Sequence, residues 1–277
     1  MTITAAQLDN FLSTLRDEEK SAATLERYGR DIRCFAQWLG DAPLTHDAVL
    51  NYKAHLTQHY AADSVNSILA ALNRFLSLLD REDCRVRRLR VQYQAYAPEE
   101  REITAQEYAA LVRTARETGR TRLALVLETI CATGIRVSEV RYITVEAAQE
   151  GRTTISLKGK IRTILLPGKL CRRLLKYAKK QKITSGEIFL TRGGKPMGRC
   201  QIWTEMKRLC KKAGVEPSKV FPHNLRHLFA TIYYQIYKDI AKLADILGHS
   251  SIETTRIYLM TTGQEHRRQL ERLQLVL

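Results

Sequence analysis

The sequence lacks the features that mark secreted, membrane-spanning and disulfide-bonded proteins. No apolar run approaches the roughly 18 residues of a membrane span, and the segment after Met1 has no basic-then-apolar signal pattern. The six cysteines are scattered without a CxxC pair, which is typical of free thiols in a reducing compartment. We therefore expect a cytoplasmic protein without a membrane partner.

Groups that would hold a metal ion or a nucleotide are also scarce. His55 and His59 lie four residues apart, but two histidines without a third ligand favour a solvated helix face over a metal site. Residues 152–226 contain three scattered acids, too few for the carboxylate cluster that a metal-dependent nuclease needs, and the chain has no glycine-rich nucleotide loop. We expect no metal and no cofactor.

The shortage of acids leaves a strongly basic segment. The chain has a formal net charge of +16, and residues 152–226 carry 20 Lys and Arg against three acids. Residues 1–88 are close to neutral, with 11 basic and 12 acidic residues. Such an uneven distribution indicates a face that follows phosphates. Charge alone leaves DNA, RNA and an anionic membrane surface open.

The first 80 residues read as four short helices. Thr4 and Gln7 form a capping box, and apolar residues follow at helical spacing. A second helix is expected from Thr24, a third from about Thr45 to Leu56, and a fourth from Asp63. Their apolar stripes predict a small helical bundle.

The rest of the chain predicts a linker and a second domain. We expect a helical domain over 1–85, a basic linker over 86–101 and a second domain over 102–277. A capping box at Thr104 opens the second domain, and two strands flank the turn at Lys158-Gly159-Lys160. The fold class is therefore mainly α with a small antiparallel β-sheet.

Two motifs in the first half of the expected second domain carry residues suited to an anionic phosphate. In ATGIRVSE, Gly134 ends a helix, Arg136 follows it, and Glu139 is placed to hold the guanidinium. At the hairpin turn, Lys158 can reach into a groove and donate a proton. Each motif alone also fits an ordinary solvated surface.

Two further motifs lie near the C-terminus. In FPHNLRH, His223 and Arg226 share one face near a helix N-terminus, where backbone N–H groups favour an anion. In LGHSSIETTRIY, His249 lies on the corner between two helices and Tyr258 comes nine residues later. A tyrosine alone is usually a core residue.

Together the motifs ATGIR with a following SE, KGK, HNLRH and LGHSS with Tyr258 resemble those of the phage integrase or tyrosine recombinase family. The resemblance covers essentially the whole chain. It implies a SAM-like N-terminal bundle that clamps DNA, a linker and an α+β catalytic domain. It also implies DNA integration or recombination, as in a mobile-element integrase or an Xer-like chromosome dimer resolvase.

The resemblance implies a role for each motif residue. Tyr258 attacks the scissile phosphodiester and forms a 3′-phosphotyrosine, while Arg136 and Arg226 hold the non-bridging oxygens. Lys158, chosen over Lys160 because it precedes the hairpin glycine, protonates the leaving 5′-oxygen. His223 accepts the tyrosine proton, and His249 hydrogen-bonds the phosphate.

The implied partners are double-stranded DNA and further copies of the chain. We expect a monomer or weak oligomer when free, a homo-tetramer on DNA, and accessory DNA-bending proteins as an open question. The segment 264–277 reads as a helix with Leu270, Leu273 and Leu277 along one side. In this family such a helix often docks on a neighbouring protomer, although packing onto its own domain stays open.

Three other functions compete with recombination. A type IB topoisomerase shares the tyrosine nucleophile but relaxes DNA, and a catalytically inactive DNA-binding regulator could keep the same fold. A basic RNA-binding protein would need aromatic stacking platforms or a known RNA module, and the sequence shows neither. The complete motif set and the residues after Tyr258 favour the recombinase.

Overall fold

The computed structural model describes residues 3–90, 102–157, 160–249, 251–256 and 271–272. Lys158, Tyr258, most of the expected C-terminal helix and residues 91–101 of the expected linker lie outside these ranges. The chain divides into two compact units, Met1–Tyr93 and Gln94–Leu277, which we describe separately. None of the described helices has both the length and the apolarity to cross a membrane.

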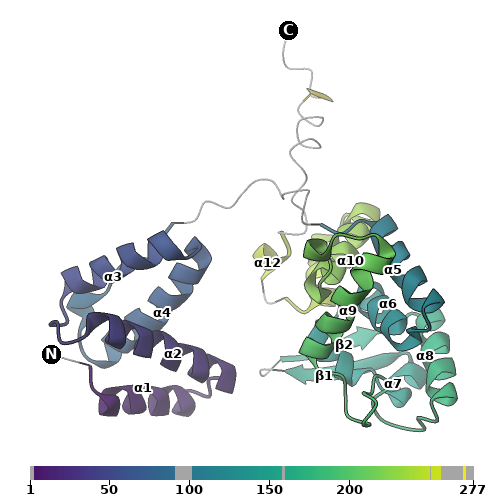
Figure 1. The fold of residues 1–277 in the computed structure, drawn as a ribbon, viewed down its shortest axis with the longest axis horizontal. Helices are drawn as coiled ribbons and strands as arrows, with labels where there is room; N and C mark the ends of the chain where they lie inside the picture. The colour runs from purple at the N-terminus through teal and green to yellow at the C-terminus, as the bar shows by residue number, and fades with distance from the viewer. Residues whose placement is uncertain (1–2, 91–101, 158–159, 250, 257–270, 273–277) are drawn as a thin grey trace. The chain divides into compact units, whose positions relative to one another are not determined.

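The first unit is a bundle of four helices (Figure 1), which are α1 (Ala5–Asp17), α2 (Ala22–Leu39), α3 (His46–His59) and α4 (Ala62–Leu78). Its core contains the buried rings of Phe11, Phe35 and Phe75. The capping box at Thr4 is confirmed. The expected start of the second helix at Thr24 is wrong, because the Ser21 side chain accepts the Thr24 N–H and caps the helix three residues earlier.

The segment after α4 is fixed to that helix by two asparagines. The Asn66 side chain exchanges two hydrogen bonds with the Leu89 backbone, at 3.0 and 2.7 Å. Asn73 makes the same pair of bonds with Val86, at 2.8 and 3.1 Å. The backbone over 86–89 therefore lies along α4, and the basic side chains between these anchors remain at the surface.

The second unit is built around α6 (Thr121–Thr133), which is buried along most of its length. Helices pack around it (Figure 1), namely α5 (Ala105–Glu117), α8 (Gly168–Lys180), α9 (Arg199–Ala213) and α10 (Pro222–Tyr237). The capping box at Thr104 is confirmed, and the FPHNLRH motif lies at a helix N-terminus as expected, because α10 begins at Pro222. Helix α6 ends at Gly134, whose left-handed backbone begins the following loop.

One antiparallel hairpin forms the sheet, as predicted. Strand β1 (Arg152–Leu157) pairs with β2 (Lys160–Leu165), with Ile155 opposite Arg162. Ile155 and Ile164 face the core, whereas Leu165 is exposed. The sheet lies beside α7 (Val145–Glu150). The 3-10 helix η3 (Val137–Tyr142) precedes α7 in the chain.

The C-terminal part of the unit packs on α10. Helix α11 (Ile240–Leu247) buries Leu243 and Leu247 against Ala230 and the ring of Phe229. It ends at Gly248, which takes the left-handed conformation, and α12 (Ile252–Arg256) follows. The expected corner between two helices is therefore present, with His249 on it.

Candidate active site

The loop after α6 presents Arg136. Gly134 has a φ of +64° and ends the helix, and Arg136 directly precedes η3. The buried carboxylate of Glu139 accepts the Arg136 backbone N–H at 2.7 Å and its Nη1 at 3.2 Å. The predicted Arg136–Glu139 pair is thus present. The Arg136 side chain keeps 45% of its surface exposed, so it is available to an anion.

Arg226 differs from an ordinary helix arginine because it is almost completely buried. Only 2% of its surface is exposed. Its guanidinium donates to the carbonyl of Gly134, to the carbonyl of Leu247 at 2.8 Å and to Nε2 of His249 at 2.9 Å. A buried charge requires such partners. Arg226 therefore joins the end of α6 to the end of α11.

His249 is held between Arg226 and α12. Its Nδ1 lies 2.9 Å from Oγ1 of the buried Thr255. A guanidinium can only donate, so Nε2 accepts from Arg226 and the ring proton sits on Nδ1, where it donates to Thr255. Burial and the positive charges of Arg226, Arg136 and Arg162 lower the pKa of His249 to about 4. The ring is neutral at pH 7.

His223 lies one helical turn before Arg226, at the exposed N-terminal end of α10. Partial burial lowers its pKa, and the charges of Arg226, His227 and Arg136 lower it further. The structure therefore brings four of the six predicted site residues into one electrostatic environment, namely Arg136, His223, Arg226 and His249. The positions of Lys158 and Tyr258 lie outside the described residues.

Sequence reasoning missed two residues that contact this cluster. Arg162 on β2 forms an ion pair with Glu139 and donates to the carbonyl of Ile246 at 3.0 Å. Thr255 holds His249. The sequence indicates only that Arg162 lies in the second strand of the hairpin, because nothing in a strand pattern tells which residue reaches a helix end 84 positions away.

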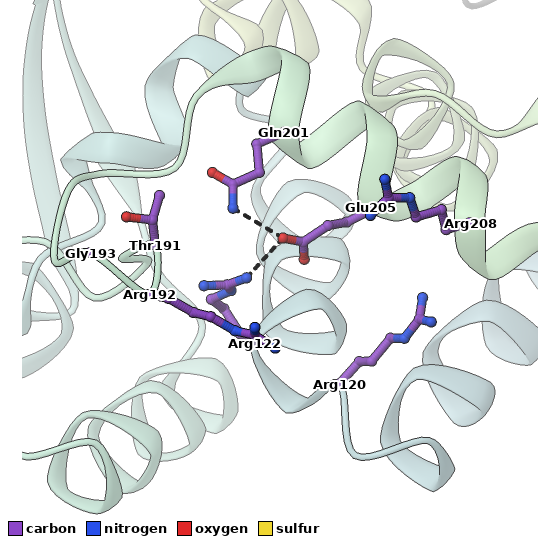
Figure 2. Close-up of a pocket in the computed structure, with 8 residues that line it drawn as sticks. All are labelled: Arg120, Arg122, Thr191, Arg192, Gly193, Gln201, Glu205 and Arg208. Carbon is purple, nitrogen blue, oxygen red and sulfur yellow. Dashed lines mark hydrogen bonds and ion pairs between the residues drawn. The ribbon is translucent and has the colours of Figure 1, made fainter.

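The described part of the second unit also has hollows that none of Arg136, His223, Arg226 and His249 lines. An apolar groove of about 590 Å³ runs between β2, α10 and α11, and its lining includes Leu165, Ile232, Ile236 and Tyr237. A second hollow, of about 600 Å³, is shown in Figure 2. There the carboxylate of Glu205 accepts hydrogen bonds from Arg122 and Gln201. Three more arginines line the hollow, namely Arg120, Arg192 and Arg208.

The described residues contain no group of three side chains placed to hold a metal ion. The site also holds guanidinium groups, and the charges of Arg136 and Arg226 lower the pKa of both His223 and His249. Guanidinium groups suit the oxygens of a phosphodiester. The fold and this cluster agree with what the resemblance to tyrosine recombinases implies.

Comparison with known proteins gives the same answer. Residues 101–265 match the phage integrase family and residues 8–83 match the phage integrase N-terminal SAM-like domain. The chain belongs to the phage integrase family. It is 30% identical to tyrosine recombinase XerD of Xanthomonas campestris, covering 93% of this chain and 88% of that relative. It is 28% identical to XerA of Thermococcus kodakarensis, covering 97% and 95%.

Solved structures share the fold. A lambda integrase(75-356) dimer bound to a core site has a TM-score of 0.75 at 20% identity, covering 93% of this chain and 95% of that one. XerH bound to a palindromic difH substrate, in a post-cleavage complex, has a TM-score of 0.73 at 17% identity, covering 96% and 84%. The predicted fold class and family are confirmed.

Proposed function

We propose that this protein is a site-specific recombinase that cuts and rejoins double-stranded DNA through a covalent bond to Tyr258. The observation that supports it most is the assembly of Arg136, Arg226, His223 and His249 from three separate segments around one positive region. Relatives with 28–30% identity over nearly the whole chain are named tyrosine recombinases. Because the substrate is DNA, we propose that the protein acts in the cytoplasm.

In this proposal the reaction proceeds by two phosphoryl transfers. Tyr258 attacks the scissile phosphorus, the 5′-oxygen leaves with a proton from Lys158, and a 3′-phosphotyrosine forms. A 5′-hydroxyl then attacks that ester and releases the tyrosine. The ester conserves the energy of the broken bond, so the protein's own side chains are sufficient without a nucleotide. Arg136 and Arg226 stabilise the charge that builds on the non-bridging oxygens.

The histidine protonation states fit these roles. A tyrosine hydroxyl has a pKa near 10, so it needs a proton acceptor close by. His223 is suited to this because its lowered pKa leaves it neutral at pH 7. His249 in the free protein has Nε2 occupied by Arg226. A bound phosphate raises the pKa of His249 by its negative charge, and the protonated ring can then donate to a phosphate oxygen.

Trapping of the covalent intermediate tests this function. A duplex selected by the protein from a random pool is nicked next to the cleavage site, so that the short leaving strand diffuses away and religation stops. We expect a covalent protein–DNA adduct with the wild type and none with Tyr258→Phe. Tyr60→Phe, an exposed tyrosine of the first unit, serves as the control and should form the adduct within about twofold of wild type.

The same trapping experiment, together with a plasmid relaxation assay, separates the alternative functions. An adduct that persists in Tyr258→Phe contradicts the assignment of the nucleophile. A wild type that binds the selected duplex but never forms an adduct is an inactive regulator. Rapid relaxation of an arbitrary supercoiled plasmid, without exchange between two selected sites, indicates a type IB topoisomerase.

We further propose that the apolar groove receives the C-terminal segment of a neighbouring copy on DNA. The groove exposes Leu165, Ile236 and Tyr237, at 73%, 65% and 64%. Residues 264–277 carry Leu270, Leu273 and Leu277 at helical spacing. A relative with a similar fold, lambda integrase, has been solved as a tetramer bound to a Holliday junction. Docking between copies would connect four protomers in a ring.

A further inference from the structure

Arg162 connects two parts of the active site without facing outward itself. Its side chain on β2 is 15% exposed. Nη2 pairs with the carboxylate of Glu139, and Nη1 donates to the carbonyl of Ile246 at 3.0 Å. Nε is buried and has no hydrogen-bond partner among the described residues. Each terminal nitrogen therefore donates at least one hydrogen bond to the protein.

The two partners of Arg162 hold the two halves of the site. Glu139 accepts the backbone N–H and the guanidinium of Arg136. Ile246 lies in the last turn of α11, three residues before His249. Arg226 joins the same two segments a second time, through the carbonyls of Gly134 and Leu247. The loop at 134–139 and the corner at 246–249 are thus joined by two arginines in parallel.

The backbone at Gly248 is packed directly onto this guanidinium. A Cβ atom at Gly248 would lie 2.5 Å from Cδ and 2.9 Å from Nη1 of Arg162. Gly248 also has a φ of +66°, which favours glycine. The corner that carries His249 therefore rests on the Arg162 side chain as well as being hydrogen-bonded through it.

We propose that Arg162 is a positioning residue for the cleavage step. Through its contacts with Glu139 and Ile246, it fixes the position of Arg136 relative to Arg226 and His249. The inference rests on the proposed function and names a residue to which that function assigns no role. If Arg162 is lost, Glu139 keeps a buried carboxylate with one fewer cation, and the loop carrying Arg136 loses one of its two connections to α11, leaving only the one through Arg226. Misplacement of a phosphate-binding group by about 1 Å is enough to slow a reaction by about 100-fold.

Arg122 offers a matched control in the same unit. It also bridges a carboxylate and a backbone carbonyl, since it pairs with Glu205 at 2.8 Å (Figure 2) and donates to the carbonyl of Leu190. Its side chain is 23% exposed. It lies at the start of α6, and that helix has 13 residues, so Arg122 is roughly 20 Å from Gly134 at the other end. The hydrogen bonds and the ion pair of Arg122 in the described structure go to Leu190 and Glu205, which are not site residues.

The test compares Arg162→Gln with Arg122→Gln in the full chain. Three quantities are measured for each variant: its thermal unfolding, its affinity for the selected duplex, and its single-turnover rate of adduct formation at saturating DNA. We expect similar losses of thermal stability and little change in affinity for both. Adduct formation should fall about 100-fold in Arg162→Gln and stay within about threefold of wild type in Arg122→Gln. Equal rates in the two variants would overturn the proposal.

Two further variants separate positioning from general stability. Glu139→Gln should slow the adduct by itself, and adding Arg162→Gln should cost little more, because both changes break one connection. Fully multiplicative losses would overturn the proposal. If Arg162→Gln does not fold, Arg162→Lys takes its place in the test. A lysine keeps the charge but cannot contact both Glu139 and Ile246, so we expect the rate of adduct formation to fall about tenfold. A wild-type rate in Arg162→Lys would overturn the proposal. A wild type without adduct indicates failure of the proposed function instead.

Discussion

At the scale of single residues, the site depends on positive charges that are held close to one another. Arg226 is buried at the centre, and its charge lowers the pKa of both His223 and His249. Crowding like charges is unfavourable in the free protein, and a phosphate reverses that cost when it binds. The same crowding has a measurable effect on stability.

The first prediction concerns the pH dependence of folding. The pKa of His249 is about 4 in the folded protein and near 6.5 in an unfolded chain. As pH falls below 6.5, the unfolded chain takes up a proton that the folded protein does not, so stability is lost progressively down to about pH 4. Between pH 7 and pH 5 this single group should remove about 2 kcal/mol from the free energy of unfolding.

Urea unfolding at the two pH values measures this effect. His249→Gln removes the titrating group, so its stability should fall by about 2 kcal/mol less than that of the wild type over the same interval. His223 shifts in the same direction and keeps a residual slope in the variant. Identical pH dependence in the two proteins would contradict the assigned environment of His249.

At the scale of elements, the ends of helices place the site. Helix α6 ends at Gly134 and α11 ends at Gly248, both in the left-handed conformation, and Arg226 bonds to carbonyls beside both ends. Gly134 is also tightly packed. A Cβ atom there would lie 2.5 Å from the Phe229 ring and 2.9 Å from Leu247.

Substitution of Gly134 by alanine is the second prediction. Gly214 ends α9 with the same φ of +64°, but a Cβ atom there would meet nothing within 4 Å. Gly214→Ala should therefore cost only the backbone strain, about 1 kcal/mol, whereas Gly134→Ala adds overpacking and should cost about 3 kcal/mol. Denaturant unfolding of both variants gives the difference. Equal costs would mean that Phe229 moves aside freely.

Helix boundaries show how far local sequence determines the elements. The capping boxes at Thr4 and Thr104 were predicted and are present, because each needs only residues three apart. Thr24 was a wrong choice because Ser21 offers the same hydroxyl and lies one turn earlier. The fourth helix starts at Ala62 without a side-chain cap, so Asp63 gave only an approximate start.

The site itself was predictable where motifs define it, and not where tertiary contacts do. Arg136 and Arg226 were identified by motif, but the burial of Arg226 was not visible, since an arginine at that helical position is usually solvated. Arg162 was missed for a related reason. Its partners Glu139 and Ile246 lie 23 and 84 positions away, and only the folded chain brings them together.

At the scale of the whole molecule, an excess of basic residues over 152–226 accompanies an apolar groove on the same unit. The charge suits DNA, and the groove suits another polypeptide. We therefore expect assembly on DNA to be separable from cleavage by one copy. Ile236 is a suitable position to change, because its side chain is 65% exposed and a charge there should leave the fold intact.

The last prediction is that Ile236→Asp weakens assembly. The variant should still bind a single selected site and form the Tyr258 adduct, but lose complexes that contain several copies and lose exchange between two sites, because a carboxylate in the groove opposes burial of an apolar segment. Native gels with labelled DNA and a recombination assay measure both. Leu50→Asp, at an exposed apolar position of 41% on α3, serves as the control.

Thermal unfolding of the free protein then distinguishes the two ways in which the groove can be filled. If residues 264–277 of the same chain occupied it, Ile236→Asp would lower the melting temperature of the isolated protein, and the loss would be absent from a variant that ends at residue 263. If a neighbouring copy supplies the segment, the free protein should melt as the wild type does, and the defect should appear only when several copies meet on DNA. Unchanged assembly and exchange in Ile236→Asp would contradict docking in this groove, because the substitution replaces an exposed apolar side chain with a carboxylate in addition to that of Asp245, and desolvating it should cost several kcal/mol.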